Sequence, residues 1–160
     1  MADSHLITPF PAEINRYYFG TWLSGFTDGE GCFRLYLNGA TKTPAAKFAI
    51  SLRRDESDIL QLIHSYFLCG AVDLRDPKPP SKPQAVFRVD KGIDLATIIV
   101  PHFEQFPLMA KKRLDFGLWA QAVRLIYSVS LRPIRLRWTE EDRNQFYDLQ
   151  DTLHEQREYR

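Results

Sequence analysis

Two acidic side chains stand two positions apart among three glycines in the stretch WLSGFTDGEG (22–31). Asp28 and Glu30 are the first candidates in this sequence for a reactive site. An arbitrary D-G-E-G is most simply interpreted as an acidic turn that ends a helix, with glycine supplying unusual backbone angles. Here a stripe of small residues at helical spacing leads into the turn: Thr21, Ser24, Gly25 and Asp28. Small residues at that spacing let a second backbone approach closely, which favours a functional turn on a closely packed helix.

Other reactive residue types show no catalytic or metal-binding pattern. No pair with metal-ligand spacing occurs among the histidines, which are His5, His64, His102 and His154. Cys32 and Cys69 are too far apart for a local zinc knuckle, and we expect both to pack as small apolar groups. Two cysteines indicate no disulfide framework, which favours a reducing compartment. The sequence also contains no phosphate-binding P-loop and no G-x-S-x-G motif.

Charge is segregated along the 160 residues, although the net charge is only +1. Residues 1–31 carry a net charge of −3 and residues 139–160 a net charge of −4. Residues 32–138 carry 17 basic and nine acidic side chains, a net charge of +8. A basic middle between acidic ends indicates a surface for nucleic acid. No apolar run reaches the ~20 residues needed to cross a bilayer, and no signal peptide is recognisable, so we expect no membrane partner.

The acidic turn must be positioned by the elements around it. We expect an irregular N-terminal arm over 1–13 and a single domain over 14–160, which begins with a helix from 14 to about 27. Its apolar face is formed by Phe19, Trp22, Leu23 and Phe26. Alternation then predicts two hairpins separated by an amphipathic helix, with strands at 32–37, 47–54, 71–75 and 85–89 and the helix at 55–70.

The remaining residues predict helices with one extended interruption. A helix begins at Asp94 and is bent or ended by Pro101. A longer helix covers 111–127, an extended segment covers 131–138, and Thr139 caps a last acidic helix. Four strands in two hairpins predict an α+β fold, in which one antiparallel sheet has helices on one face. The other face is expected to be basic, polar and open.

The opening stretch carries a resemblance to a known family. LSGFTDGEG (23–31) resembles the LAGLIDADG motif of the homing endonucleases, with Leu23, Gly25, Asp28 and Gly31 identical and Glu30 in place of the second aspartate. The predicted order of elements matches the family's αββαββα core. FPLMAKKRLDF (106–116) also looks like the family segment that contributes a basic residue to the active site. Together these features cover most of residues 14–127.

The resemblance implies a homodimer with a shared metal site, because single-motif family members act as homodimers. Their motif helices pack together through small residues, here Thr21, Ser24, Gly25 and Asp28. Glu30 of each subunit would hold a divalent metal, Mg²⁺, together with the backbone carbonyl of Gly29. Such a metal would activate water and neutralise charge on the leaving oxygen. Asp28 would have a structural role at the helix end.

A lysine is also expected at the active site by resemblance. Lys111 best matches the family's lysine, which stabilises transition-state charge or polarises water, and Lys112 is the alternative in register. One position departs from the family pattern. Some members carry a water-positioning glutamine at the end of the second strand, where this sequence has Leu52. Either Ser51 or Arg53 would then substitute for the glutamine, or the active-site water would be ordered by another group.

DNA contacts are expected on the open face of the sheet and on the hairpin loops. Arginine reads guanine edges in the major groove, whereas many other contacts are to phosphate. The expected contact residues are Arg34, Tyr36, Lys47, Arg53, Arg75 and Arg88 on the sheet, and Asn38, Lys42, Lys78 and Lys82 on loops. The segment RPIRLR (132–137) is expected to be a phosphate contact or a surface strand.

The resulting hypothesis is a site-specific double-stranded DNA endonuclease. By resemblance it would cut a long, roughly palindromic target by metal-dependent phosphodiester hydrolysis and so promote intron mobility. The alternative is an intron-splicing maturase or a catalytically inactive DNA-binding protein of the same fold. Localisation would be intracellular, with the DNA that is cut, in an organelle (chloroplast or mitochondrion) or a microbial cytoplasm.

Overall fold

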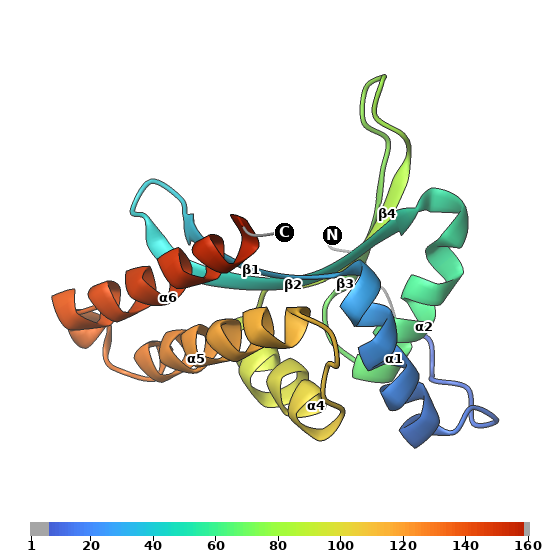
Figure 1. The fold of residues 1–160 in the computed structure, drawn as a ribbon, viewed down its shortest axis with the longest axis horizontal. Helices are drawn as coiled ribbons and strands as arrows, with labels where there is room; N and C mark the ends of the chain where they lie inside the picture. The colour runs from blue at the N-terminus through green and yellow to red at the C-terminus, as the bar shows by residue number, and fades with distance from the viewer. Residues whose placement is uncertain (1–6, 159–160) are drawn as a thin grey trace.

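A computed structural model describes residues 7–158 (Figure 1). The expectations for residues 1–6, including His5 and the start of the N-terminal arm, and for 159–160 lie outside the described residues. The elements are α1 (Arg16–Glu30), β1 (Gly31–Asn38), β2 (Thr43–Arg53), η1 (Arg54–Glu56), α2 (Ser57–Phe67), β3 (Ala71–Arg75), β4 (Gln84–Val89), α3 (Gly92–Asp94), η2 (Leu95–Ile99), α4 (Val100–Gln105), α5 (Lys112–Ser130), η3 (Ile134–Leu136) and α6 (Glu140–Glu158).

The four strands form one antiparallel sheet in the order β1-β2-β4-β3. In Figure 1, α1, α2, α4 and α5 lie on one side of this sheet. The β1–β2 turn and the long β3–β4 loop rise on the opposite side, which gives the sheet two raised ends. The α+β fold with an open four-stranded sheet is therefore confirmed.

Strand alternation separates the two faces of the sheet. Phe33, Phe48 and Phe87 point toward the helices and are fully buried. Arg34 and Lys47 are directly opposed on β1 and β2 and lie on the other side, which we call the open face. Burial of large apolar side chains is the dominant favourable term in folding, so this alternation fixes which face the helices cover.

The acidic helix α6 lies alongside β1, at the edge of the sheet (Figure 1). Gln150 Nε2 donates to the Leu35 carbonyl at 3.2 Å, and the Arg157 guanidinium donates to the Phe33 carbonyl. An edge strand presents unpaired backbone groups that must be satisfied or covered. α6 therefore covers the β1 edge of the sheet. The expected arrangement, with all helices on one face, left this edge uncovered.

α1 continues to Glu30, three residues beyond the predicted end. Its last turn includes Gly29, and the Gly31 N–H donates to the Thr27 carbonyl. Gly31 has φ −76°, an ordinary extended conformation, so the simple interpretation in which glycine supplies unusual backbone angles does not apply at this position. Glycine is required because an added Cβ would lie 2.8 Å from the Thr27 carbonyl oxygen.

After residue 90, one prediction is narrowed and another is wrong. Pro101 does not end the helical run, because α4 continues to Gln105; a π-helical turn (η2) directly precedes α4, and of the two predicted alternatives only a bend at Pro101 remains. The expected extended segment 131–138 instead contains the short helix η3. There, Arg137 donates to the Ser130 carbonyl at 2.8 Å and Arg132 binds the Asp142 carboxylate at 2.6 Å, so these arginines hold the chain between α5 and α6.

Candidate functional site

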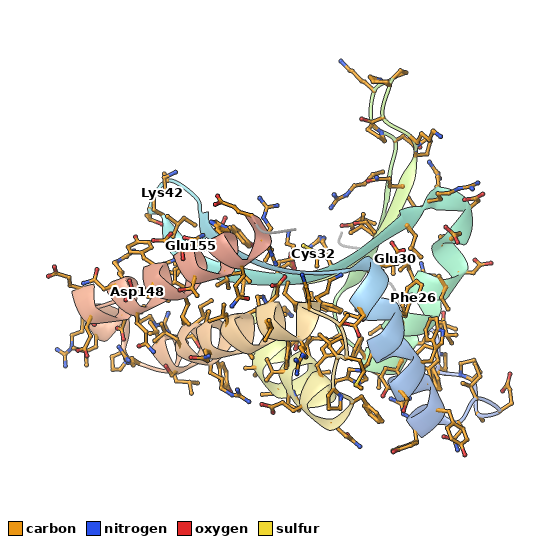
Figure 2. The ribbon with its side chains drawn as sticks, viewed as in Figure 1. Phe26, Glu30, Cys32, Lys42, Asp148 and Glu155 are labelled. Carbon is orange, nitrogen blue, oxygen red and sulfur yellow. The ribbon has the colours of Figure 1, made fainter. Side chains whose placement is uncertain are left out.

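The end of α1 places the predicted acidic residue beneath the sheet. Glu30 is the last residue of α1 and is exposed, and β1 begins at the next residue. Figure 2 shows Glu30 where α1 meets the sheet, with Cys32 farther along it. Cys32 is exposed on the open face, contrary to the expectation that it packs in the interior, whereas Cys69 is buried and its pKa is raised to about 12 by desolvation.

Asp28 connects the end of α1 to the segment that precedes α5. Its Oδ2 atom accepts hydrogen bonds from the Met109 N–H at 2.8 Å and from the Ala110 N–H at 3.1 Å. A carboxylate at a helix C-terminus opposes the helix dipole, so these donors offset an unfavourable position. Their positions explain how a segment more than 80 residues away is held against the acidic turn.

Lys112 is the lysine that reaches this site. Its Nζ donates to the Thr27 carbonyl at 3.1 Å and lies 3.4 Å from the Gly29 carbonyl. Both carbonyls belong to the last turn of α1, and the Thr27 carbonyl also accepts from the Gly31 N–H. Lys111 is exposed and immediately precedes α5. The geometry thus favours the register alternative, Lys112, at the position expected for Lys111.

The four predicted interface residues do not share one environment. Thr21 and Gly25 are exposed, and an added Cβ at Gly25 would meet no atom within 4 Å. Ser24 is buried, and its hydroxyl donates to the Phe106 carbonyl at 2.6 Å. Within the described chain, a side chain packs tightly against α1 at Gly20, which is not part of the small-residue stripe, because an added Cβ there would lie 2.7 Å from the Phe106 ring.

A shallow groove follows the outer side of α1. It has a volume of about 310 Å³ and is lined by Tyr17, Thr21, Ser24, Gly25, Gln105, Phe106, Pro107 and Met109. Tyr17 is 64% exposed and Met109 is 85% exposed. The face of α1 that carries Gly25 is therefore both apolar and open.

The oxygen donors fit a hard divalent cation but form only part of a ligand set. Glu30 offers an exposed carboxylate, and the adjacent Gly29 offers a carbonyl that also accepts from Lys112 Nζ at 3.4 Å. Mg²⁺ prefers such oxygen ligands in octahedral geometry. Within residues 7–158, no group of three His, Cys, Asp or Glu side chains is placed to hold a metal. The described chain thus offers two candidate oxygen donors at this position, the Glu30 carboxylate and the Gly29 carbonyl.

All six predicted sheet contacts lie on the open face. Strand register places Arg34 opposite Lys47, and Arg53 and Arg75 in line with Gln84. Of the loop contacts, Asn38 ends β1, Lys42 lies in the β1–β2 turn, and Lys78 and Lys82 lie in the β3–β4 loop. The structure thus brings these ten residues to the sheet face and loops opposite the main helical layer: Arg34, Tyr36, Asn38, Lys42, Lys47, Arg53, Arg75, Lys78, Lys82 and Arg88.

Two carboxylates on the open face were not anticipated. Arg88 Nε donates to Asp73 at 2.5 Å, and its Nη1 donates to Asp90 at 2.6 Å. Lys47 lies 3.6 Å from the same Asp90 carboxylate. Period-two alternation could have found both residues, since Asp73 shares a face with Arg75 and Asp90 shares a face with Arg88.

Leu52 is on the covered face of β2 and packs against the core. Ser51 and Arg53 point to the open face, so strand alternation places both on the side opposite Leu52. The position expected for the water-binding glutamine therefore holds an apolar side chain. The side chains of Ser51 and Arg53 lie on the other face of the strand and do not occupy the same place.

Comparisons with known proteins show the family to which the chain belongs. The family model for the LAGLIDADG endonuclease matches residues 23–123. The chain belongs to the LAGLIDADG endonuclease family. An uncharacterised 50.9 kDa protein in ND4 intron 1 of Podospora anserina is 35% identical over 114 residues, which are 66% of this chain and 24% of that protein. The probable intron-encoded endonuclease Cox1-I1b of Schizosaccharomyces pombe is 30% identical over 121 residues, 73% of this chain and 30% of that protein.

Solved structures share the LAGLIDADG fold. The meganuclease I-AabMI, bound to uncleaved DNA, superposes with a TM-score of 0.67 and 29% identity, covering 86% of this chain and 44% of its own. The homing endonuclease I-TnaI superposes with a TM-score of 0.68 at 22% identity, covering 88% of this chain and 96% of its own. This LAGLIDADG chain thus spans about a quarter of the first fungal relatives and matches nearly the whole of I-TnaI. No helix within residues 7–158 is long and apolar enough to cross a membrane.

Proposed function

We propose that this LAGLIDADG chain is a site-specific, divalent-metal-dependent DNA endonuclease that cuts double-stranded DNA as a homodimer. The observation that carries the proposal is the arrangement at the end of α1, where Glu30, the Gly29 carbonyl and Lys112 meet beneath an open face with basic side chains. The DNA-bound state of I-AabMI, a relative at 29% identity, supports DNA as the partner. The target would be long and roughly palindromic, as twofold symmetry of the protein requires.

A second copy completes the site in this proposal. Each chain contributes Glu30 and the Gly29 carbonyl, and the open side of α1 around Gly25 packs against its twin. Mg²⁺ bound there would supply an activated water and neutralise charge on the leaving oxygen. In a longer protein, a second LAGLIDADG domain would occupy the same face.

Each chain's own residues would position the DNA and the proton-transfer chemistry. Arg34, Arg75 and the loop lysines would bind the duplex on the open face, so that a phosphate lies above the end of α1. Lys112 would donate to the developing negative charge from a position already fixed by two carbonyls. The domain would act where its target DNA lies, in an organelle or a microbial cell, and would promote mobility of an intron.

Cleavage of the uninterrupted insertion locus tests this proposal. Purified chain is incubated with duplex carrying that locus in Mg²⁺, and in parallel with Ca²⁺ to measure binding without cutting. We expect Mg²⁺-dependent double-strand cleavage that Glu30→Gln reduces at least a thousandfold while binding in Ca²⁺ stays within threefold. Glu155→Gln, an equally conservative change at an exposed carboxylate on α6, is expected to cut normally.

Tight binding without cutting by the unmodified chain would refute the nuclease and favour the maturase or inactive binder. Normal cutting by Glu30→Gln would refute the role assigned to the acidic turn, even if the chain proved to be a nuclease.

A further inference from the structure

A compact charge cluster occupies the centre of the open face. Arg88 of β4 binds Asp73 of β3 through Nε at 2.5 Å and Asp90 through Nη1 at 2.6 and 2.9 Å. Lys47 of β2 lies 3.6 Å from Asp90 and 5.7 Å from the ring centroid of Tyr36. Two cations and two carboxylates thus form one network across β2, β4 and β3, with no net charge. We call these four charged residues the central cluster: Lys47, Asp73, Arg88 and Asp90.

This pairing changes what Arg88 can do on a DNA-binding face. Its side chain is 33% exposed, and its Nε and Nη1 donors are already engaged by carboxylates. Within residues 7–158, hydrogen bonds of this guanidinium involve Nε and Nη1, which leaves the Nη2 donors for a ligand. The same contacts raise the pKa of Arg88 above its usual range, chiefly through the hydrogen bond to Asp73.

Carboxylates beside a phosphate chain are unfavourable, because DNA affinity comes largely from cations that neutralise phosphates and release counterions. A cluster of zero net charge contributes little to this electrostatic part of the binding free energy. Asp73 and Asp90 would lower affinity if Arg88 served only to bind phosphate. In contrast, Arg75 is exposed on the same face with no ion pair in the described part of the chain.

Carboxylates that fix a guanidinium have a different use, which is to orient it. An arginine held in one geometry loses less conformational freedom on binding, and Arg is the side chain that most often donates to guanine O6 and N7 in the major groove. Base-edge contacts give specificity, whereas phosphate contacts give position.

We propose that the central cluster is a specificity element, in which Asp73 and Asp90 orient Arg88 to read a guanine in each half of the target without adding to non-specific affinity. This inference rests on the proposed function, since it requires the open face to contact duplex DNA. Neither carboxylate was among the expected DNA contacts.

Binding measurements on the whole chain test the inference. A preferred duplex is selected from a randomised library in Ca²⁺, and dissociation constants are then measured for all single-base variants and for unrelated duplex, each over a salt series. The proteins are the unmodified chain, Arg88→Ala, the double variant Asp73→Asn with Asp90→Asn, and Arg75→Ala as the matched control on the same face.

Arg88→Ala is expected to abolish preference at one position of each half-site, from at least tenfold to less than threefold. It is also expected to weaken binding to unrelated duplex severalfold, because it leaves Asp73 and Asp90 without the guanidinium that neutralises them. The Asn double variant is expected to lose the same preference but to bind unrelated duplex several times more tightly, with a salt slope steeper by about one to two. Arg75→Ala is expected to weaken binding to every sequence and to reduce the slope by about one.

The inference is overturned if Arg88→Ala weakens binding to every sequence by the same factor and leaves the base preference intact, as is expected of Arg75→Ala, which would make Arg88 a phosphate contact. It is also overturned if Arg88→Ala or the Asn double variant keeps the full base preference, because the cluster would then only join strands. If the unmodified chain binds no duplex at all, the proposed function is refuted. If it binds duplex and the variants keep its base preference, only the inference about the central cluster is refuted.

Discussion

Replacing Lys112 with methionine tests whether the side chain at the end of α1 does chemistry. The change removes the ammonium and keeps most of the aliphatic stem. In the structure the ammonium donates to Thr27 O at 3.1 Å and approaches Gly29 O at 3.4 Å. Hydrogen bonds from a charged donor contribute about 1.5–3 kcal/mol when well formed, and these two are long and partly exposed, so we expect a loss of about 1–2 kcal/mol in unfolding free energy.

The expected effect on cleavage is larger than the effect on stability. Removing one positioned donor to developing negative charge costs about 10²–10³ in rate, or about 2.7–4 kcal/mol in the transition state. A chain of this size loses about 2–4 °C in melting temperature per kcal/mol, so the variant remains folded at 25 °C. We therefore expect single-turnover cleavage to slow by about 10²–10³ while DNA binding in Ca²⁺ weakens no more than severalfold.

Lys111→Met is the matched control, because Lys111 is the adjacent residue and is exposed. Its cleavage rate is expected within threefold of the unmodified chain and its stability within about 0.5 kcal/mol. Both variants are compared by single-turnover cleavage, Ca²⁺ binding and thermal unfolding. If Lys111→Met abolishes cutting and Lys112→Met does not, the assignment drawn from the α1 carbonyls is wrong.

Two further predictions concern association and pH. Gly25→Leu is expected to convert the proposed dimer to a monomer in sedimentation and to abolish cutting. The fold of the monomer is expected to be unaffected, because no described atom lies within 4 Å of an added Cβ. Gly117→Leu, equally open on α5, is the control and is expected to sediment as the unmodified chain does, and a Gly25→Leu variant that remains dimeric would contradict the interface. Burial lowers the pKa of His102 to about 4. In the unfolded chain the same imidazole has a pKa near 6.5, so between pH 6.5 and pH 4 the unfolded chain binds a proton that the folded chain does not. The contribution of neutral His102 to the unfolding free energy is therefore complete above pH 6.5 and decreases toward pH 4, by about 2 kcal/mol at pH 5. His102→Leu is expected to reduce this dependence in urea unfolding and His154→Gln to keep it, and equal dependence in His102→Leu would refute the assignment.

Strand positions were predictable from sequence because burial on one face imposes a period of two. Phe33 and Arg34 point to opposite sides, as alternation requires, and the same rule placed the predicted contacts on the open face. The course of 131–138 was not predictable in this way. Pro133 cannot donate to a strand ladder, and Arg132 finds Asp142 in the next helix, a tertiary contact that local pattern does not contain.

The acidic turn was predictable as a motif, but its lysine was not fixed by sequence. Lys111 and Lys112 are adjacent and chemically equal, so only the direction of the first turn of α5 separates them. The cap of α6 was local and was predicted correctly, since Thr139 Oγ1 accepts from the Asp142 N–H at 3.2 Å. The same alternation rule places Asp73 and Asp90 on the open face, but their negative charge is opposite to that of the basic residues expected to contact DNA.

The glycines of the motif region indicate how much of the site one chain contains. Gly20 and Gly31 are explained by their own chain, since a Cβ at either would collide with Phe106 or Thr27. Gly25 has no such neighbour, yet a glycine inside a helix costs about 1 kcal/mol relative to alanine. An open helical glycine is not sufficient evidence of a partner, because Gly117 is equally open. What distinguishes Gly25 is its place in an apolar groove one turn before Gly29. In the proposed dimer, the partner's α1 would therefore both fill the groove and supply a second Glu30 carboxylate.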